Sequence, residues 1–360
     1  MKKKIILVIS SIEKGGTQKN IIDLFNYWKK RGHDLKFITF DKNADTVNLV
    51  KKKNFINLNL KKNSNNFFES IFNNLSRIYQ LRKIFKKSQN NHIVSFISTT
   101  NILTIIANIG LKNKVIVCER NDIEFQKIPK AWRILRKIFY RFADIITANS
   151  LKSCKYLQKF ISKRKIFFIQ NHIFFKKKGS NLKKRKIILA IGRLHYQKGF
   201  DVLIEAFYFS KLYIKGWKLV ILGEGPERKQ LEYKVKKLKI NNNVFFKGFV
   251  NPKNWYKRSR LFVLSSRFEG TPNVFLEAIS MGLPTIITNN CSGALYYVKD
   301  KISTLVVKSE NINELSNAMI KLAENKKLQK KIITEGLKKA SILANSKKIF
   351  NKWDLILKKN

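Results

Sequence analysis

The sequence has 360 residues, of which 74 are Lys or Arg and 23 are Asp or Glu, so its formal net charge is +51. This length suits two domains of ordinary size, each with its own core. No stretch is long and apolar enough to cross a bilayer, so we expect no membrane-spanning helix.

The positive charge has two readings. Taken alone, it points to a nucleic acid or an anionic membrane surface as a partner. The excess is mostly lysine, is accompanied by abundant Asn and Ile, and is spread over the whole chain. An AT-rich genome produces the same pattern on solvated faces, so the composition leaves both readings open.

The N-terminus and the cysteines indicate where the chain resides. A basic start and a short apolar run, MKKKIILVISSIEKGG, lead to Gly15 and Gly16 without a small-residue cleavage site. This favours a first strand over a signal peptide. The cysteines, Cys118, Cys154 and Cys291, are odd in number and far apart. We therefore expect a reduced, cytosolic chain without a metal cluster.

Short apolar runs alternate with segments of helical period along the first half of the chain. Predicted helices include 20–30 and 132–142. The predicted strands are 4–10, 35–40, 92–98, 114–120 and 144–150. A stretch rich in Lys, Gly, Ser and Asn at 176–185 is typical of a linker.

The alternation then restarts, with predicted strands at 186–193, 217–223, 243–249, 261–266 and 284–288. Strands that alternate with helices imply βαβ units and parallel sheets with helices on both faces. The sequence therefore predicts an α/β protein with two doubly wound, Rossmann-like domains, 1–175 and 176–345, facing across a cleft. A final amphipathic helix, 346–360, is expected to pack back on the first domain.

Ligands of open α/β sheets bind beyond the carboxyl ends of the strands, so residues that follow strands are site candidates. The first candidate is SSIEKGGTQKN, 10–20, where Gly15 and Gly16 allow close approach to a ligand and the next helix offers free N–H groups. Such a glycine turn is as often purely structural. The segment is not GxGxxG, so a dinucleotide fingerprint is absent.

The second candidate is AIGRLHYQKGFDVLIEAF, 190–207. Arg193 follows a strand, and Lys198 precedes Gly199 at a helix start. An Arg fork and a Lys point charge beside a glycine turn make a phosphate clamp, although both could be ordinary surface cations. Further glycine turns follow later strands in GEGP, 223–226, and in FKGFVNP, 246–252, whose backbone could hold a flat base.

The third candidate is RFEGTPNVFLEAISMGLPTIITNN, 267–290, which places seven residues between Glu269 and Glu277. A helix is predicted to begin with Pro272 near its first position, and the amides at this end would suit a phosphate. Either glutamate alone could be a capping or solvated carboxylate. Together with the glycine turn and the helix start, they predict a pocket lined by both.

These segments resemble a known family. E-x7-E in FEGTPNVFLEAISMGLPTIIT, together with GRLHYQKGFDVLIEAF and GEGP, is similar to the retaining glycosyltransferases of family four, which have the GT-B fold. The resemblance covers nearly the whole chain and is most specific in the second half. GGTQKN resembles the N-terminal glycine loop of the family. CERND, 118–122, resembles a version in members that add hexose or N-acetylhexosamine to lipid-linked glycans and other cell-surface polysaccharides.

The resemblance implies a role for each matching residue. Arg193 and Lys198 would neutralise the diphosphate of a nucleotide-sugar as it leaves, and Glu269 would face the hydroxyls of the transferred sugar. These three are the expected catalytic residues. Glu277 would accept hydrogen bonds from the ribose. The other residues expected to bind the donor are Gly15, Gly16, Gly192, Phe249, Val250, Gly270, Thr271, Pro272, Asn273 and Val274.

The chemistry of the leaving group supports this assignment. Loss of a nucleoside diphosphate develops charge on phosphate oxygens, which fixed donors stabilise. A divalent metal could do the same, but no Asp-x-Asp occurs in the chain. We therefore expect a metal-independent enzyme that needs no cofactor and uses a nucleotide-sugar as its donor substrate. Retention would follow, as in the family, from front-side attack assisted by the leaving phosphate.

One departure from the family concerns the acceptor side. Many members place a histidine after a strand in the middle of the first domain, but none of the four histidines, His33, His92, His172 and His195, lies there. The corresponding strand leads to Glu119 and Arg120, either of which could substitute. Possible contacts with the acceptor or the sugar are Thr17, Glu119, Arg120 and Asn121. The residue that deprotonates the acceptor is left open.

Two predicted helices of the first domain carry a basic face. In 127–142 the cations Lys130, Arg133, Lys137 and Arg141 line the side opposite the apolar positions, and 75–87 is similar. Each is either a core-facing helix with a solvated face or a docking element for anionic lipid. In the second case each basic residue near the surface contributes about 1 kcal/mol of binding free energy. The second reading also suits the pyrophosphate of a polyprenyl-linked acceptor.

The sequence thus predicts an enzyme that moves a hexose or N-acetylhexosamine from a nucleotide-sugar, expected to be UDP-linked, to a lipid-linked or surface-polysaccharide glycan. We expect it in the cytoplasm, peripheral on the inner face of the cell membrane, without a nucleic-acid partner. One alternative, a UDP-sugar epimerase of GT-B fold, would need an additional set of acidic and histidine residues. The other, a basic nucleic-acid-binding protein, would explain the charge but not the paired glutamates.

Overall fold

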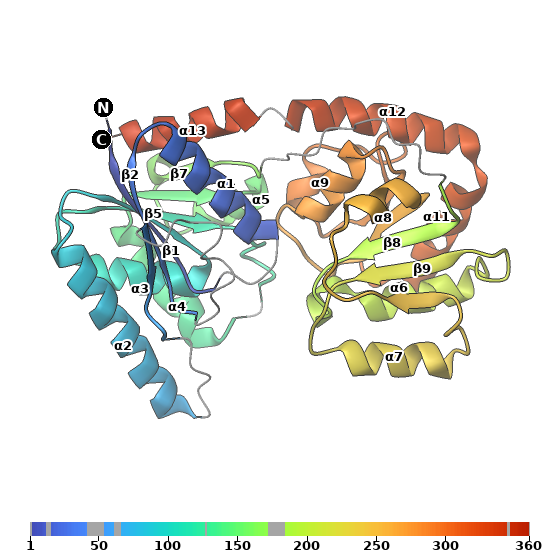
Figure 1. Cartoon of the computed structure of the whole chain (residues 1–360), viewed down its shortest axis with the longest axis horizontal. Helices are drawn as coiled ribbons and strands as arrows, with labels where there is room; N and C mark the ends of the chain where they lie inside the picture. The colour runs from blue at the N-terminus through green and yellow to red at the C-terminus, as the bar shows by residue number, and fades with distance from the viewer. Residues whose placement is uncertain are drawn as a thin grey trace. The chain divides into compact units, whose positions relative to one another are not determined.

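The computed structural model describes residues 2–11, 16–41, 54–60, 66–126, 128–171, 184–343 and 346–359. Contacts divide the chain into two compact units. Unit 1 comprises Met1–Asn171 and Lys347–Asn360, and unit 2 comprises His172–Ser346. In each unit helices pack against a parallel sheet (Figure 1).

Unit 1 has a seven-stranded sheet in the order β3-β2-β1-β4-β5-β6-β7. All neighbouring strands are parallel. The strands are β1 (Lys4–Ile9), β2 (Asp34–Thr39), β3 (Phe55–Asn57), β4 (His92–Phe96), β5 (Lys114–Glu119), β6 (Ile145–Ala148) and β7 (Ile166–Phe168).

The helices of unit 1 cover both faces of this sheet. Successive side chains of a strand point to opposite faces. In β1, Ile5 and Leu7 pack with α1 and α13, whereas Ile6 and Val8 pack with α2 and α3. The helices are α1 (Gly16–Lys30), α2 (Phe67–Lys86), α3 (Ser98–Asn108), α4 (Lys130–Phe139), α5 (Leu151–Leu157) and α13 (Ser346–Lys358), with short 3₁₀ turns at Tyr140–Phe142 and Lys163–Lys165.

The C-terminal helix α13 packs on α1 within unit 1. The rings of Trp353 and Trp28 meet edge to face, and Asp354 accepts hydrogen bonds from the Tyr27 hydroxyl at 2.7 Å and from Trp28 Nε1 at 3.2 Å. Because Trp353 is 3 % exposed, the last residues of the chain complete the core of the first domain. Leu355 lies on the opposite side of the helix and is exposed.

Unit 2 repeats the architecture with a six-stranded parallel sheet in the order β10-β9-β8-β11-β12-β13. The strands are β8 (Ile187–Ile191), β9 (Lys218–Leu222), β10 (Val244–Phe246), β11 (Leu261–Leu264), β12 (Thr285–Thr288) and β13 (Leu305–Val307). The helices are α6 (Phe200–Phe209), α7 (Arg228–Lys237), α8 (Lys253–Arg258), α9 (Asn273–Ser280), α10 (Ser292–Leu295), α11 (Ile312–Glu324) and α12 (Lys326–Leu343), with a 3₁₀ turn at Tyr196–Lys198.

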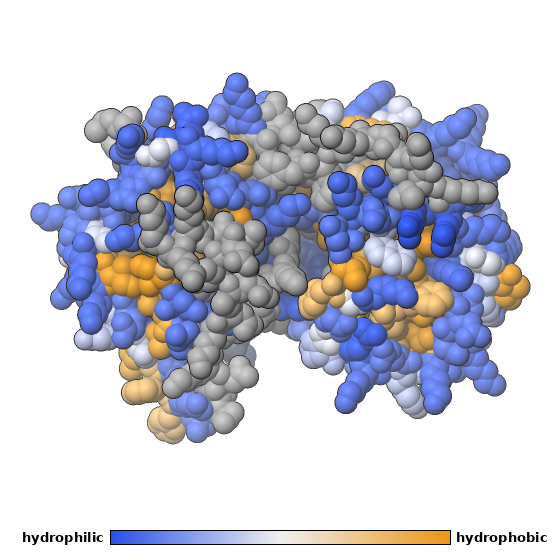
Figure 2. Space-filling model, viewed as in Figure 1, coloured by the Kyte–Doolittle hydropathy of each residue, from blue (hydrophilic) through white to orange (hydrophobic). Residues whose placement is uncertain are grey.

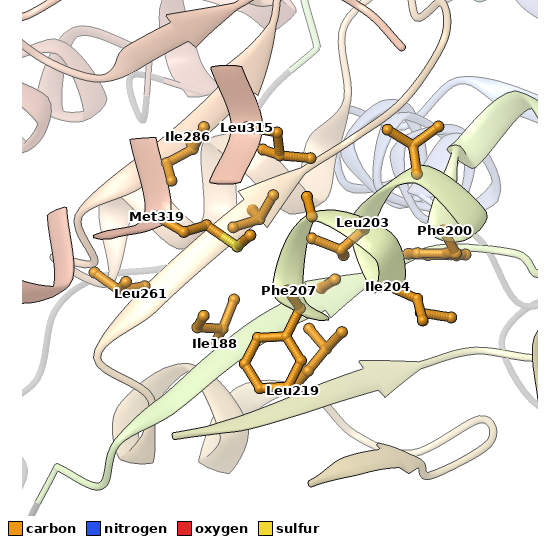
Figure 3. Close-up of a cluster of buried hydrophobic side chains, with 14 of the residues drawn as sticks. Ile188, Phe200, Leu203, Ile204, Phe207, Leu219, Leu261, Ile286, Leu315 and Met319 are labelled. Atoms are coloured by element: carbon orange, nitrogen blue, oxygen red, sulfur yellow. The ribbon is translucent and has the colours of Figure 1, made fainter. Parts of the chain in front are cut away.

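One core of unit 2 lies between the sheet and the pair α6 and α11 (Figure 3). Phe207 of α6 and Met319 of α11 are fully buried there against strand residues such as Ile188. Burying a side chain of this size contributes about 1.5–3 kcal/mol. The opposite face is covered by α8, α9, α10 and α12. The sheet is therefore a rigid base for the loops at its carboxyl end.

The two doubly wound α/β domains predicted from the sequence are confirmed. In both sheets the chain runs outward in one direction for the first three strands and then returns to the other side of the first strand. The reversal lies between β1 and β4 in unit 1 and between β8 and β11 in unit 2. Such a switch point is where open α/β sheets bind ligands. The short strands β3, β7 and β13 are additions to the predicted set.

Candidate active site

The loops that follow β8 and β11 flank the switch point of unit 2. The first loop carries Arg193 and Lys198, and the second carries Glu269. Because β8 and β11 are neighbours in the sheet, their carboxyl ends bring these two segments together. The predicted catalytic residues of the second domain therefore share one edge of one sheet.

Lys198 ends the 3₁₀ turn that leads into α6. Its backbone N–H donates to the His195 carbonyl at 2.8 Å, and its own carbonyl accepts from Ser265 Oγ at 2.9 Å. Gly199 follows with φ of +61°, and a Cβ there would lie 2.3 Å from the Ser265 carbonyl oxygen. Only glycine allows the β8 and β11 loops to approach this closely.

The Lys198 ammonium forms an ion pair with the Glu269 carboxylate. The exposed fractions of the two side chains are 18 % and 10 %. The Glu269 backbone N–H donates to the Asn290 carbonyl at 3.1 Å, which fixes the base of the side chain. A lysine ammonium has three donors, so this contact leaves Lys198 able to bind further acceptors.

Arg267 joins the same two loops from within the protein. It is 8 % exposed, and its Nη1 and Nη2 donate to the two oxygens of Asp201 at 2.9 and 2.7 Å. Burial acts to lower the pKa of Arg267, but the hydrogen bonds to Asp201 and Glu310 raise it above its usual value. Burial acts to raise the pKa of Asp201, and Arg267 brings it below the usual value. Both groups are therefore charged at neutral pH.

The helix α9 begins one residue later than the sequence indicated. Pro272 is the N-cap residue and makes no side-chain capping bond, and the first helical residue is Asn273. The preceding turn packs against α10, where a Cβ on Gly293 would lie 2.4 Å from the Gly270 carbonyl oxygen. The first amides of an α-helix have no acceptor within the helix. The helix start lies where the sequence indicated, and the role of Gly270–Val274 in binding an anion stays a prediction.

Glu277 lies on α9 beside the fully buried Tyr256 of α8. The Tyr256 hydroxyl is 3.0 Å from Glu277 Oε2 and 3.1 Å from the Val274 carbonyl oxygen, and it donates to this pair of acceptors. Burial and the charge of Glu277 raise the pKa of Tyr256 well above its usual value. Tyr256 therefore remains a donor at physiological pH and orients the Glu277 carboxylate.

The turns after β8 and β9 meet through their backbones. A Cβ on Gly223 would lie 1.9 Å from the Gly192 carbonyl oxygen, and a Cβ on Gly192 would meet the Lys198 side chain at 3.0 Å. Within the described part of the chain, the exposed guanidinium of Arg193 has no hydrogen-bond or ion-pair partner. Arg193 is thus available to a ligand at the same sheet edge.

The predicted base-binding residues follow β10. Gly223 N–H donates to the Gly248 carbonyl at 2.9 Å, which places the end of β10 beside the β9 turn. Phe249 and Val250 come next and are 56 % and 43 % exposed. Their position beside the GEGP turn agrees with a role in holding a flat ring.

The glycine loop of unit 1 is described only in part. Gly15 lies outside the described residues. Gly16 is the first residue of α1, and Thr17 follows it within the helix. The described backbone thus has the end of β1 and the start of α1 at the switch point of unit 1.

Glu119 at the end of β5 is buried in a polar network. It is 1 % exposed, and both of its oxygens accept from Ser98 Oγ at 2.9 Å while Tyr140 donates to one of them. Asn101 Nδ2 donates to the Tyr140 oxygen at 3.0 Å. Burial raises the pKa of Glu119, although Arg136 and these hydrogen bonds oppose the rise. The network connects β5 with α3 and with the end of α4.

Arg120 turns toward α13 instead. Its guanidinium lies over the rings of Trp353 and Phe96, at 5.3 and 5.8 Å from their centres, and donates to the Ile169 carbonyl at 3.1 Å. The carbonyl of Asn121 accepts from Ser153 Oγ at 3.3 Å. These contacts give Arg120 and Asn121 a place in the framework of unit 1, and their predicted contact with the acceptor stays a prediction.

Two of the described histidines, His33 and His195, have local partners. His33 Nδ1 accepts from the Lys3 amide at 3.0 Å, and His195 Nδ1 accepts from the Gln197 amide at 3.3 Å. Across the described ranges, no group of three or more His, Cys, Asp and Glu side chains has the arrangement of a metal site. None of the helices in those ranges has the length and apolar character needed to span a bilayer.

Sequence reasoning missed two residues of the site. Arg267 lies inside the segment that contains Glu269, but its partner Asp201 lies 66 residues away. Tyr256 meets Glu277 across 21 residues from a separate helix. No local pattern predicts either contact, because both depend on how the sheet brings distant segments together.

Comparison with known families gives two matches along the chain. Residues 172–339 match Glycosyl transferases group 1, and residues 21–147 match the Glycosyltransferase family 28 N-terminal domain. The first match contains the whole β8 to β11 site, and the second contains α2, α3, α4 and part of α1.

Several curated relatives are named for a glycosyl transfer reaction, including one from Campylobacter jejuni and one from Escherichia coli. The chain is 29 % identical over 336 residues to a Campylobacter jejuni protein named GalNAc-alpha-(1->4)-GalNAc-alpha-(1->3)-diNAcBac-PP-undecaprenol alpha-1,4-N-acetyl-D-galactosaminyltransferase, covering 92 % of this chain and 91 % of that protein. It is 24 % identical over 286 residues to an Escherichia coli UDP-Gal:alpha-D-GlcNAc-diphosphoundecaprenol alpha-1,3-galactosyltransferase, covering 72 % and 73 %.

Solved structures show the same fold. Anabaena Alr3699/HepE in complex with UDP superposes with a TM-score of 0.81 over 99 % of both chains at 17 % identity. Sucrose-phosphate synthase from Thermosynechococcus elongatus superposes with a TM-score of 0.83 over 99 % of this chain and 98 % of that one at 16 % identity. At these identities the likeness concerns the architecture alone.

Proposed function

The chain belongs to the glycosyltransferases of GT-B fold, and we propose that it moves a hexose or N-acetylhexosamine from a UDP-linked donor to a lipid-linked or surface-polysaccharide glycan. The observation that carries this proposal is the Lys198–Glu269 ion pair at the switch point between β8 and β11. It joins a phosphate-binding cation to a carboxylate that can accept hydroxyl hydrogen bonds.

The donor diphosphate binds to Arg193, Lys198 and the start of α9 in this proposal. Arg193 is exposed without a partner in the described chain, Lys198 keeps free donors, and the helix end adds a positive dipole. As the bond to the sugar breaks, charge develops on the phosphate oxygens. Donors already fixed there stabilise the transition state, each by about 2.7–4 kcal/mol.

The sugar and the ribose are held by the two glutamates. Glu269, next to Lys198, accepts from hydroxyls of the transferred sugar. Glu277, oriented by Tyr256, accepts from the ribose hydroxyls. Because a carboxylate accepts several hydrogen bonds and donates none, both residues suit hydroxyl-rich parts of a ligand. The E. coli relative is named for UDP-Gal as its donor, which supports UDP as the nucleotide.

Retention and metal independence are parts of the same proposal. The names of the C. jejuni and E. coli relatives specify alpha linkages, which supports retention from an alpha-linked donor. Arg193 and Lys198 provide the positive charge that a divalent ion supplies in other transferases. The leaving phosphate then assists attack of the acceptor hydroxyl on the same face of the sugar.

The acceptor is proposed to be a polyprenyl-linked glycan reached at an anionic membrane surface. The two relatives are named for undecaprenol-linked acceptors, which supports this choice. On α4, Ile134 and Ile138 are 58 % and 48 % exposed beside the cations of that helix. On α2, Phe72 is 72 % exposed, and Figure 2 shows hydrophobic surface along the lower part of this helix.

These apolar side chains favour the membrane-docking interpretation of α2 and α4. A helix that only covers a core exposes its polar face, whereas α2 and α4 also expose apolar side chains. Apolar residues flanked by Lys and Arg are the pattern of helices that lie in a membrane interface. We therefore place the enzyme at the membrane surface, as a peripheral protein of the cytoplasmic face.

The two alternatives have less support. The named relatives transfer sugars, and neither is named as an epimerase. A role in nucleic-acid binding would use the charge of the chain but would leave the Lys198–Glu269 and Tyr256–Glu277 pairs unused. Both observations favour transfer.

A screen of UDP-sugars with a polyprenyl-pyrophosphate-linked glycan tests the proposal. Mass spectrometry would identify the product, and NMR would establish the anomeric configuration, in EDTA and in Mg²⁺. We expect transfer with retention in both buffers, and strong loss in Arg193→Ala but not in the control Arg260→Ala. Inversion, or a strict need for Mg²⁺, would overturn the corresponding part of the proposal.

A further inference from the structure

Arg267 is nearly buried between the two loops that carry the proposed donor-binding residues. We propose that Arg267 is a positioning residue, which fixes the loop 195–199 so that the Lys198 ammonium reaches the donor diphosphate. This inference rests on the proposed function, since it concerns how that site is held. The Arg267 side chain itself bonds to Asp201 and Glu310.

The contacts of Arg267 converge on the residues before Lys198. Its Nη1 donates to the Tyr196 carbonyl at 2.7 Å, and its backbone N–H donates to the Gln197 carbonyl at 2.8 Å. Gln197 returns a hydrogen bond from Nε2 to the Phe268 carbonyl at 3.0 Å. The 3₁₀ turn is thereby bonded to the β11 loop immediately before Lys198, and Glu269 follows Phe268 on the other side.

Asp201 holds the guanidinium in this orientation. The fork of Arg267 meets both oxygens of Asp201, a bidentate geometry that fixes the plane of the group. The Tyr196 ring lies 4.0 Å from the guanidinium carbon and covers it. Glu310 accepts from Nε at 2.7 Å, but it is 53 % exposed and is the weaker partner.

Lysine could not perform this task. Its ammonium is a single point charge, whereas Arg267 serves Asp201, Tyr196 and Glu310 at once through a planar group. Arg267→Lys therefore keeps the charge, the stem and the backbone bond to Gln197, but it removes the guanidinium bond that holds the Tyr196 carbonyl. We therefore expect Arg267→Lys to weaken binding of the diphosphate, which is the proposed ligand of Lys198.

Titration calorimetry with UDP on the full chain tests this inference, using Lys198→Ala, Arg267→Lys and the double variant. We expect Arg267→Lys to weaken UDP binding about tenfold, the loss that one charge-assisted hydrogen bond accounts for. If Arg267 acts through Lys198, the double variant binds UDP as Lys198→Ala does. The matched control is Arg260→Lys, an exposed arginine of the same unit that should bind as the wild type does.

The outcomes separate the inference from the proposed function. Additive losses in the double variant, or unchanged binding by Arg267→Lys, would overturn the positioning role while leaving the donor site intact. Equal UDP binding by the wild type and Lys198→Ala would overturn the proposed donor site, and the positioning role with it. Asp201→Asn provides a second test, because it weakens the bidentate bond to the guanidinium without changing Arg267. It should also weaken UDP binding, and this loss should be non-additive with that of Lys198→Ala.

Discussion

The Lys198 ammonium and the Glu269 carboxylate form an ion pair across 71 residues of sequence, at the point where the strand order of unit 2 reverses. Each side chain is mostly shielded from water. The pair orients both groups before any ligand arrives. A cation that we propose to neutralise phosphate and a carboxylate that we propose to accept from a sugar thus lie side by side.

The charge of Glu269 can be removed without changing its shape. Glu269→Gln should lower kcat about 10²–10³-fold, as loss of one preorganised electrostatic contact does, because the sugar loses its acceptor and Lys198 its partner. UDP binding should change little, since Lys198 then faces the diphosphate alone. Steady-state transfer and calorimetry measure the two effects. The control Glu232→Gln, on α7, should behave as the wild type does. If Glu269→Gln lost UDP affinity together with kcat, the assignment of Glu269 to the sugar would be contradicted.

Tyr256 should act on the ribose through Glu277. Tyr256→Phe removes the hydroxyl that lies 3.0 Å from Glu277 and should weaken UDP binding by about tenfold or more, the value of one hydrogen bond to a charged group. Binding of 2′,3′-dideoxy-UDP should be unaffected, because that ligand lacks the hydroxyls that Glu277 accepts from. Equal losses for both nucleotides would show that Tyr256 only supports the fold. Tyr233→Phe, at an exposed position, is the matched control.

His92 makes the stability of unit 1 depend on pH. Burial, followed by the charges of Lys3 and Lys114, lowers the pKa of His92 from 6.5 to about 4. The unfolded chain binds this proton at a higher pH than the folded chain does. The stabilisation is therefore complete above pH 6.5 and is lost as the pH falls toward 4, by about 3 kcal/mol in all.

Urea unfolding of the wild type and His92→Gln at pH 7.5 and 4.5 isolates this contribution. The wild type should lose about 2–3 kcal/mol more than the variant on acidification. The difference between the two proteins cancels the titration of other groups, including Asp144, which faces His92 and favours its protonated form. Identical pH dependence in both proteins would rule out His92 as the cause.

The exposed apolar side chains of α2 and α4 should hold the protein at anionic membranes. The wild type should float with vesicles that contain anionic lipid, less so at high salt, because cations near the surface contribute about 1 kcal/mol each. The double variant Phe72→Ser and Ile138→Ser should float poorly at any salt. Leu355→Ser removes an exposed leucine from α13, outside the two basic helices, and should have no effect on flotation. Salt-independent flotation of the double variant at the wild-type level would contradict the interfacial placement.

The strands of both sheets could be predicted because they are buried on both faces and read as continuous apolar runs. The short strands β3 and β7 were not predicted, since their few residues are mostly half-buried and show no alternation. The glycine turns point to the residue types of the proposed donor site, and that assignment stays a prediction. The residues that contact these site residues could not be predicted from the sequence. Asp201, Tyr256 and the Trp353 ring over Arg120 come from distant segments, and only the completed sheets bring them into contact.

The central claim is that Lys198 neutralises the diphosphate of a nucleotide-sugar without help from a metal. The most direct test is the transfer rate of the wild type and of Lys198→Ala with the preferred UDP-sugar in EDTA. We predict full activity of the wild type in EDTA and a loss of about 10²–10³-fold in kcat for Lys198→Ala. Wild-type activity that EDTA abolishes, or a Lys198→Ala variant with an undiminished rate, would contradict the claim.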